Sequence, residues 1–102
     1  MFHPAHIVVE APYRFEDYQI TLYGEQYSVD GSTVVYGDDP EDFTSYDFDS
    51  ADISVVQRMS DLEEISWWSI DKYARDYALR QIHEKIGMDT NVPELLEREY
   101  HV

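Results

Sequence analysis

The chain has 102 residues, 43% of them hydrophobic and 15% aromatic, and its formal net charge is −15. This length predicts a single domain over residues 1–102, and the hydrophobic content is too high for a disordered chain. Because the chain has no cysteine, disulfides and thiolate metal sites are excluded. No segment has the pattern of a signal peptide or a membrane span, so we expect a cytoplasmic protein of the producing or infected cell.

The N-terminal half has the patterns of β-strands. The β-branched run within His6–Glu10 predicts a first strand, which Pro12 ends or confines to a sheet edge. A polar connector is expected over 14–17. The alternation of apolar and polar residues over 18–22 then predicts a second strand.

A β-hairpin is predicted over 25–36. Asp30-Gly31 has the composition of a two-residue type I′ turn, with Gly31 at positive φ. A bulge at Gly24 would bring the preceding strand into phase with this hairpin. The resulting register places on one face Tyr27, Val29, Val34 and Tyr36.

The C-terminal half predicts helices after one more strand. The β-branched run over 53–59 favours a strand over the first turn of a helix. Ser60 and Glu63 have the spacing of a capping box, which predicts a helix from Asp61. The buried face of that helix is expected to hold Leu62, Ile65 and Trp68.

A repeat of apolar residues at i+4 steps predicts a longer helix that ends near Gly87. Its apolar positions are Ile70, Ala74, Ala78, Ile82 and Ile86. Asn91 and Glu94 resemble another capping box, so a short terminal helix is expected over 92–100. The predicted fold is α+β: an antiparallel sheet of three to four strands in the N-terminal half, with C-terminal helices packed on one face.

The segment Gly37–Asp52 has the most uneven charge, with seven acids among its sixteen residues and no base. Such a surface repels nucleic acid and anionic membranes, and it attracts a basic partner. Aromatic side chains lie among these carboxylates and could fill apolar slots of that partner. The predicted partner-binding residues of this segment are Asp38, Asp39, Glu41, Asp42, Phe43, Tyr46, Asp47, Phe48, Asp49 and Asp52.

Trp67 and Trp68 complete the predicted partner-binding set. Neighbouring residues on a helix point about 100° apart, so both indoles cannot lie at the centre of one core face. One is expected to anchor the chain to the sheet and the other to lie near the surface, as an interface residue or as a boundary residue covered by the N-terminal segment.

No metal or cofactor site is predicted. Asp47, Asp49 and Asp52 are spaced as D-x-D-x-x-D, but Ala51 stands where a calcium loop needs an oxygen ligand. The histidines have no zinc-site spacing, and His83 is expected to be solvated on a helix surface.

Catalysis and nucleic-acid binding are also not predicted. The chain has no phosphate-binding loop and no nucleophile motif, which indicates a protein that is not an enzyme. The bases Lys72, Arg75 and Arg80 alternate with acids, so they predict a salt-bridged helix surface rather than a surface that binds phosphates.

The acidic profile and small size resemble those of nucleic-acid-mimic inhibitors, such as anti-restriction and anti-CRISPR proteins, and of immunity proteins that neutralise basic nucleases. The resemblance implies an inhibitor whose partner is a basic nucleic-acid-handling protein, and it assigns no residues. The alternative is a structural or assembly protein whose acidity serves solubility or salt adaptation. A small hydrolase or metal-dependent enzyme with an unrecognised site is the third possibility.

Overall fold

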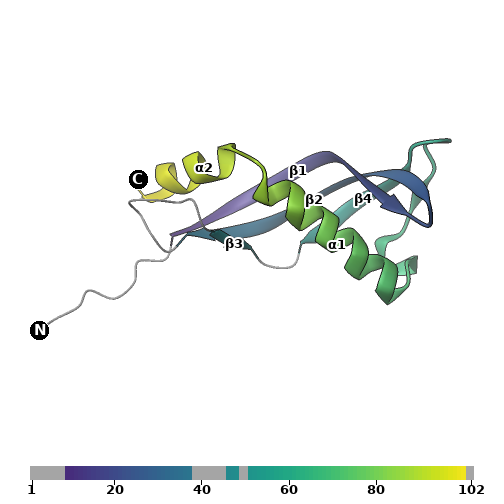
Figure 1. Cartoon of the computed structure of the whole chain (residues 1–102). Helices are drawn as coiled ribbons and strands as arrows, with labels where there is room; N and C mark the ends of the chain where they lie inside the picture. Colours follow the sequence, from purple (N-terminus) through teal and green to yellow (C-terminus); the bar gives the residue numbers. More distant parts are fainter. Residues whose placement is uncertain (1–8, 38–45, 49–50, 101–102) are drawn as a thin grey trace, which may run out of the picture.

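The computed structural model describes residues 9–37, 46–48 and 51–100 and confirms the predicted α+β class (Figure 1). An antiparallel sheet in the order β1-β2-β4-β5 forms one layer, β3 pairs with the end of β2, and the helices pack on one face. In chain order the elements are β1 Val9–Leu22, β2 Glu25–Gly37, β3 Tyr46–Phe48, β4 Asp52–Arg58, β5 Glu64–Ile65, the 3₁₀ turn η1 Trp67–Ser69, α1 Lys72–Gly87 and α2 Asn91–Tyr100.

β1 is one long edge strand, so the predicted connector over 14–17 is wrong. A bulge between Phe15 and Tyr18 accommodates the polar residues without ending the strand. Within it Asp17 has a φ of 56°. Pro12 lies on this edge strand, where the missing N–H is tolerated as predicted. Residues 6–8 of the predicted first strand lie outside the described residues.

The chain turns from β1 to β2 at Tyr23-Gly24, so both the predicted turn at Asp30-Gly31 and the predicted bulge at Gly24 are wrong. Tyr23 and Gly24 have positive φ angles of 51° and 75°, as a type I′ turn requires at both central residues. Asp30 lies in the middle of β2, where its side chain accepts the N–H of Asp17 at 2.8 Å. Asp30 therefore stabilises the bulge of β1 through this hydrogen bond, and the Asp30-Gly31 pair does not form a turn.

Gly31 provides close packing rather than a positive φ. It lies between Phe15 on β1 and Ile53 on β4. A Cβ atom at this position would lie 2.5 Å from the carbonyl oxygen of Asp52 and 2.7 Å from Cζ of Phe15. Only a residue without a side chain fits there unless the neighbours shift.

The corrected register also changes which side chains of β2 are buried. Tyr27 and Val29 are buried as predicted, together with Val35. Val34 and Tyr36 alternate with these buried residues and therefore point to the opposite face, where they are half-buried. The predicted grouping of all four on one face is wrong because the strand continues through Gly31.

The predicted strand over 53–59 is confirmed by β4, but the helix predicted from Asp61 is wrong. The backbone N–H of Arg58 donates to the carbonyl of Glu63 at 2.8 Å, which closes a tight turn between β4 and β5. Leu62 and Trp68 are exposed instead of buried. Ile65 alone of the predicted buried face packs against the core.

α1 begins at Lys72. The preceding residue, Asp71, is the N-cap, and its side chain accepts the N–H of Ala74 at 3.0 Å. The predicted i+4 stripe is confirmed, because its members pack in or against the core and form the contact with the sheet. The helix ends at Gly87, as predicted from the sequence. A cluster of buried apolar residues from both layers forms the core.

The edge of β1 is held to α1 by a side chain. Gln81 accepts the backbone N–H of Thr21 through Oε1 at 2.8 Å and donates from Nε2 to the Thr21 carbonyl at 2.9 Å. These two bonds replace the pairing that a further strand would supply.

α2 follows a turn at Asp89 and confirms the predicted terminal helix. Asp89 accepts the N–H of Asn91 through Oδ1 at 2.9 Å and that of Val92 through its carbonyl at 3.3 Å. The helix start therefore depends on Asp89 rather than on the predicted Asn91 capping box. Val92 and Leu96 are the buried residues of α2.

Candidate functional site

The structure places only part of the predicted acidic site. Asp38, Asp39, Glu41, Asp42, Phe43 and Asp49 lie outside the described residues. The three residues of β3 are Tyr46, Asp47 and Phe48, and this strand pairs with the end of β2. Asp52 begins β4 and is exposed. The later part of the acidic segment is thus joined to β2 at two places.

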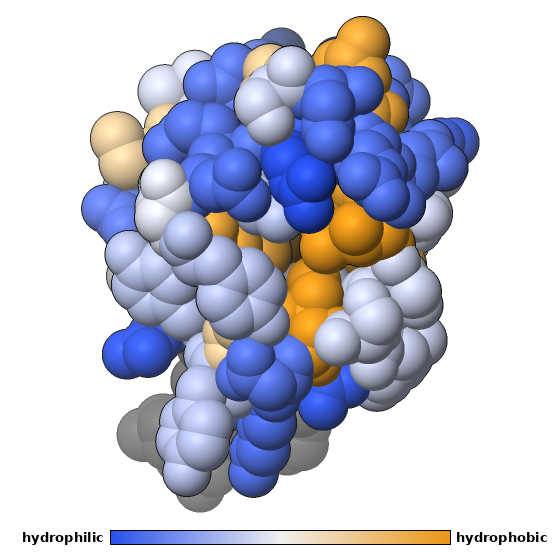
Figure 2. Space-filling view, turned by 90° about the vertical axis from the view of Figure 1, so that its right-hand side faces the viewer, coloured by the Kyte–Doolittle hydropathy of each residue, from blue (hydrophilic) through white to orange (hydrophobic). Residues whose placement is uncertain are grey.

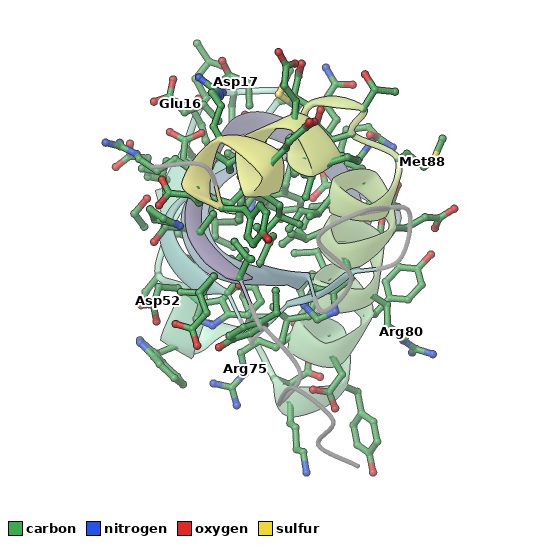
Figure 3. The ribbon with its side chains drawn as sticks, turned by 90° about the vertical axis from the view of Figure 1, so that its left-hand side faces the viewer. Glu16, Asp17, Asp52, Arg75, Arg80 and Met88 are labelled. Atoms are coloured by element: carbon green, nitrogen blue, oxygen red, sulfur yellow. The ribbon has the colours of Figure 1, made fainter. Side chains whose placement is uncertain are left out.

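The sheet face turned away from the helices carries an acidic surface that the sequence analysis did not group. The strand alternation and the bulge of β1 place six acids from four strands on this surface, which we call the open face. Its acids are Glu10, Glu16, Asp17, Asp30, Asp52 and Glu64. Figure 3 shows Glu16, Asp17 and Asp52 on the side of the sheet away from α1. Among described residues its one base is Arg14, whose Nη2 lies 3.8 Å from Oε1 of Glu16.

The bases of the chain gather instead on α1, which carries Lys72, Arg75, Arg80 and Lys85 against Asp76 and Glu84. None of these bases lies within ion-pair distance of a described acid, so the predicted salt bridges do not form among these residues. Arg80 lies over the ring of Tyr77, 6.0 Å from its centroid. Figure 3 shows Arg80 on the outer side of α1, opposite the acids of the sheet.

The two tryptophans behave as the sequence predicted, although they lie in η1 rather than in an α-helix. Trp67 packs against the core, whereas the side chain of Trp68 is 80% exposed. The guanidinium carbon of Arg75 lies 5.1 Å from the centroid of the Trp68 ring, within the range of a cation–π contact.

Beside η1 is a groove of about 430 Å³ between α1 and the start of β4. We call it the Trp groove. Its apolar lining comes from Ala51, Ile53, Trp67, Trp68 and Leu79. Its charged lining comes from Lys72 and Arg75, together with Asp52 and Asp76.

The turn between β4 and β5 is organised around Arg58, a residue that the sequence analysis did not single out. Its guanidinium lies 3.0 Å from Asp61 and 3.5 Å from Glu63 through Nη1, and 3.4 Å from Glu25 through Nε. A hydrogen bond to the Tyr27 hydroxyl and the nearby carboxylates raise the pKa of Arg58 above its ordinary value. The backbone N–H of Glu63 and the Arg58 charge lower the pKa of Asp61.

A second polar cluster lies between β1 and the turn that precedes α2. The Tyr13 hydroxyl donates to Oδ2 of Asp89 and lies 2.5 Å from the Tyr18 hydroxyl. Burial, followed by the hydrogen bond to Asp89, raises the pKa of Tyr13, and burial also raises that of Tyr18. Both hydroxyls therefore stay protonated near neutral pH, and the cluster fastens the turn to the sheet.

His83 is half-buried on α1, so its predicted place on a solvated surface is wrong. Burial lowers its pKa because the charged imidazolium loses contact with water. Within the described residues, no group of three or more His, Asp or Glu side chains could hold a metal ion. No helix in this part of the chain has the length and apolar character needed to cross a membrane.

Comparison with protein-family models, curated proteins and solved structures gave no match. The candidate site therefore rests on the geometry of this chain. The open face could have been found from the sequence only with the correct register, because strand pairing places Asp30, Asp52 and Glu64 on the same side as Glu10 and Glu16, and the bulge at 15–18 adds Asp17.

Proposed function

We propose that this protein is an acidic interaction module that is not an enzyme, and that it inhibits a basic nucleic-acid-handling protein by presenting a nucleic-acid-like negative surface. The separation of charge carries the proposal. The open face holds six acids and one ion-paired base, while α1 holds four bases. A basic groove would be attracted to the sheet side and repelled from the α1 side, which fixes the orientation of binding.

The open face is also suited in shape. On a strand, residues that share a face recur at about 6.8 Å, and neighbouring strands lie about 4.8 Å apart. At the bulge of β1, Glu16 and Asp17 lie beside Asp30 of β2, and the sheet backbone holds these carboxylates close together, as a sugar–phosphate backbone holds its phosphates.

Capture from a lysate that has been treated to remove nucleic acid tests the proposal. We expect the immobilised protein to retain a basic nucleic-acid-binding protein that added duplex DNA displaces, because both ligands would occupy one groove. Affinity should fall as salt rises, since the screening length shortens to about 8 Å at 0.15 M. Retained proteins that duplex DNA does not displace would contradict mimicry.

Two variants of equal charge locate the surface. The first changes the open face through Glu10→Gln, Asp52→Asn and Glu64→Gln. The second neutralises three helix acids through Glu84→Gln, Glu94→Gln and Glu97→Gln. Long-range attraction weakens equally in both, so only the first should lose direct contacts and bind at least about tenfold more weakly. Equal losses would place the binding surface elsewhere.

A further inference from the structure

Exposed apolar side chains gather at one end of the molecule. The Tyr23 hydroxyl donates to Oδ2 of Asp71 at 2.6 Å, which joins the β1–β2 turn to the start of α1. The backbone N–H of Met59 donates to the Gln26 carbonyl at 2.9 Å and brings the β4–β5 turn to the same end. We call the resulting surface the hairpin-end patch, which comprises Tyr23, Met59, Leu62, Trp68 and Tyr73. All five are exposed. Figure 2, which views this end, shows orange hydrophobic surface in the gaps between hydrophilic side chains.

Leu62 is held outward in a strained conformation. Its φ is 61°, in the left-handed region that a leucine rarely adopts, and its side chain is 63% exposed. The Leu62 N–H donates to the Arg58 carbonyl at 2.8 Å, and Gln57 Nε2 donates to the Leu62 carbonyl at 3.0 Å. The turn is therefore fixed on both sides of an apolar side chain that is mostly exposed to solvent. Strain maintained in this way is typical of contact sites.

The charges around the patch are of two kinds. Asp61, Glu63 and Glu64 flank Leu62 and are all exposed. The Trp groove, next to Trp68, carries Lys72 and Arg75 together with Asp52 and Asp76, and neither base lies within ion-pair distance of a described acid. An acidic turn with a protruding leucine thus lies beside a partly apolar groove whose two bases are available to a second copy.

We propose that the hairpin-end patch is the interface of a homodimer, in which Leu62 of each copy enters the Trp groove of the other. In a two-fold arrangement the same patch serves both copies, so each acidic turn meets Lys72 and Arg75 across the interface. A groove of about 430 Å³ has room for a leucine side chain. Apolar surface of this kind is uncommon on a monomer unless a partner covers it.

A second copy fits this end better than a basic partner does. Lys72 and Arg75 repel a basic surface and attract Glu64, whereas Asp61 and Glu63 already pair with Arg58 of their own chain. The basic partner of the proposed function would instead bind the open face, which shares only Glu64 and Asp52 with the dimer contact. This inference does not depend on that function.

Sedimentation equilibrium of the purified protein tests the dimer. We expect the wild type to dimerise reversibly, and more strongly as salt rises, because salt screens the repulsion between two chains of charge −15 while charges in direct contact are screened less. The opposite salt response is expected for the basic partner. A wild type that stays monomeric at every concentration and salt level would overturn the proposal.

Substitutions in the patch and away from it provide the comparison. Leu62→Asn removes the apolar side chain and introduces a residue that tolerates the left-handed region. Trp68→Gln removes the exposed indole. Each should weaken dimerisation about thirtyfold while the monomer stays folded by circular dichroism. Met88→Gln is the control, because Met88 is also exposed but lies beyond the other end of α1. An equal loss in the control would refute the patch as the interface.

A charge exchange tests the two-fold pairing. Glu64→Lys and Arg75→Glu should each dimerise poorly alone, because like charges then face each other twice. In an equimolar mixture of the two variants, a heterodimer has opposite charges at both contacts. One contact is the native pair of Glu64 and Arg75, and the other is the same pair with its charges exchanged, so we expect heterodimers to form. A mixture that associates no better than its components would exclude the proposed arrangement.

Discussion

Gly31 shows how a residue without a side chain lets neighbouring strands and a buried ring pack closely. Replacing it with alanine should destabilise the fold by about 1–3 kcal/mol, because the new Cβ would press on the backbone of Asp52 and the ring of Phe15. Urea unfolding monitored by tryptophan fluorescence would measure the loss.

Gly87→Ala is the matched control, because Gly87 ends α1 and a Cβ there meets no atom within 4 Å. Alanine at this position should be neutral or stabilising by up to about 1 kcal/mol, since it restricts the unfolded chain. If the two substitutions had the same effect, close packing at Gly31 would not be the reason for the glycine.

The Asp30-Gly31 pair has the composition of a hairpin turn, but in the structure it lies within a strand. Asp-Gly is the strongest short hairpin signal, yet Asp30 is used to bind the N–H of Asp17. The turn falls at Tyr23-Gly24, where a tyrosine accepts a φ of 51° and its hydroxyl reaches the N-cap of α1. A contact between residues so distant in sequence leaves no local pattern to read.

At the scale of elements, Gln81 joins the helical layer to the edge of the sheet. Gln81→Ala should cost about 1–2 kcal/mol, because two hydrogen bonds to Thr21 are lost while helix propensity is kept. Amide exchange at Thr21 should also become faster, and this readout is specific to the contact.

Glu84→Ala serves as the comparison on the same helix, since Glu84 is exposed and α1 should tolerate alanine there. Unchanged exchange at Thr21 in the Gln81 variant would show that the edge is protected by something else.

Elements with a repeated pattern were predictable and those set by one long-range contact were not. The i+4 stripe of α1 gave the helix and its buried face, because burial of that stripe depends only on periodicity. Ser60 and Glu63 also had helix-start spacing, but Arg58 draws both Asp61 and Glu63 into the turn of a β-hairpin. The acidity of the candidate site and the different exposure of the two tryptophans were predictable from the sequence, whereas the open face depended on the pairing register of the strands.

At the scale of the whole molecule, the net charge of −15 acts against folding as well as for recognition. Like charges repel in the compact state, so added sodium chloride should raise the melting temperature at dilute, monomeric protein concentration. Scanning calorimetry across a salt series measures this rise.

A variant with Glu94→Gln, Glu97→Gln and Glu99→Gln should melt higher at low salt and respond less to added salt. These acids are exposed side chains of α2, which carries a single base, Arg98. An unchanged salt response would indicate that repulsion is local to the sheet.

The features that interrupt β1 have a consequence for aggregation. An edge strand of fourteen residues is long enough to template the addition of another chain through its backbone. Pro12 supplies no N–H, the bulge bends the strand near Asp17, and Gln81 occupies both backbone groups of Thr21. The stretches between these interruptions are too short to pair with the strand of another copy, so the chain can keep a long edge strand without forming fibres.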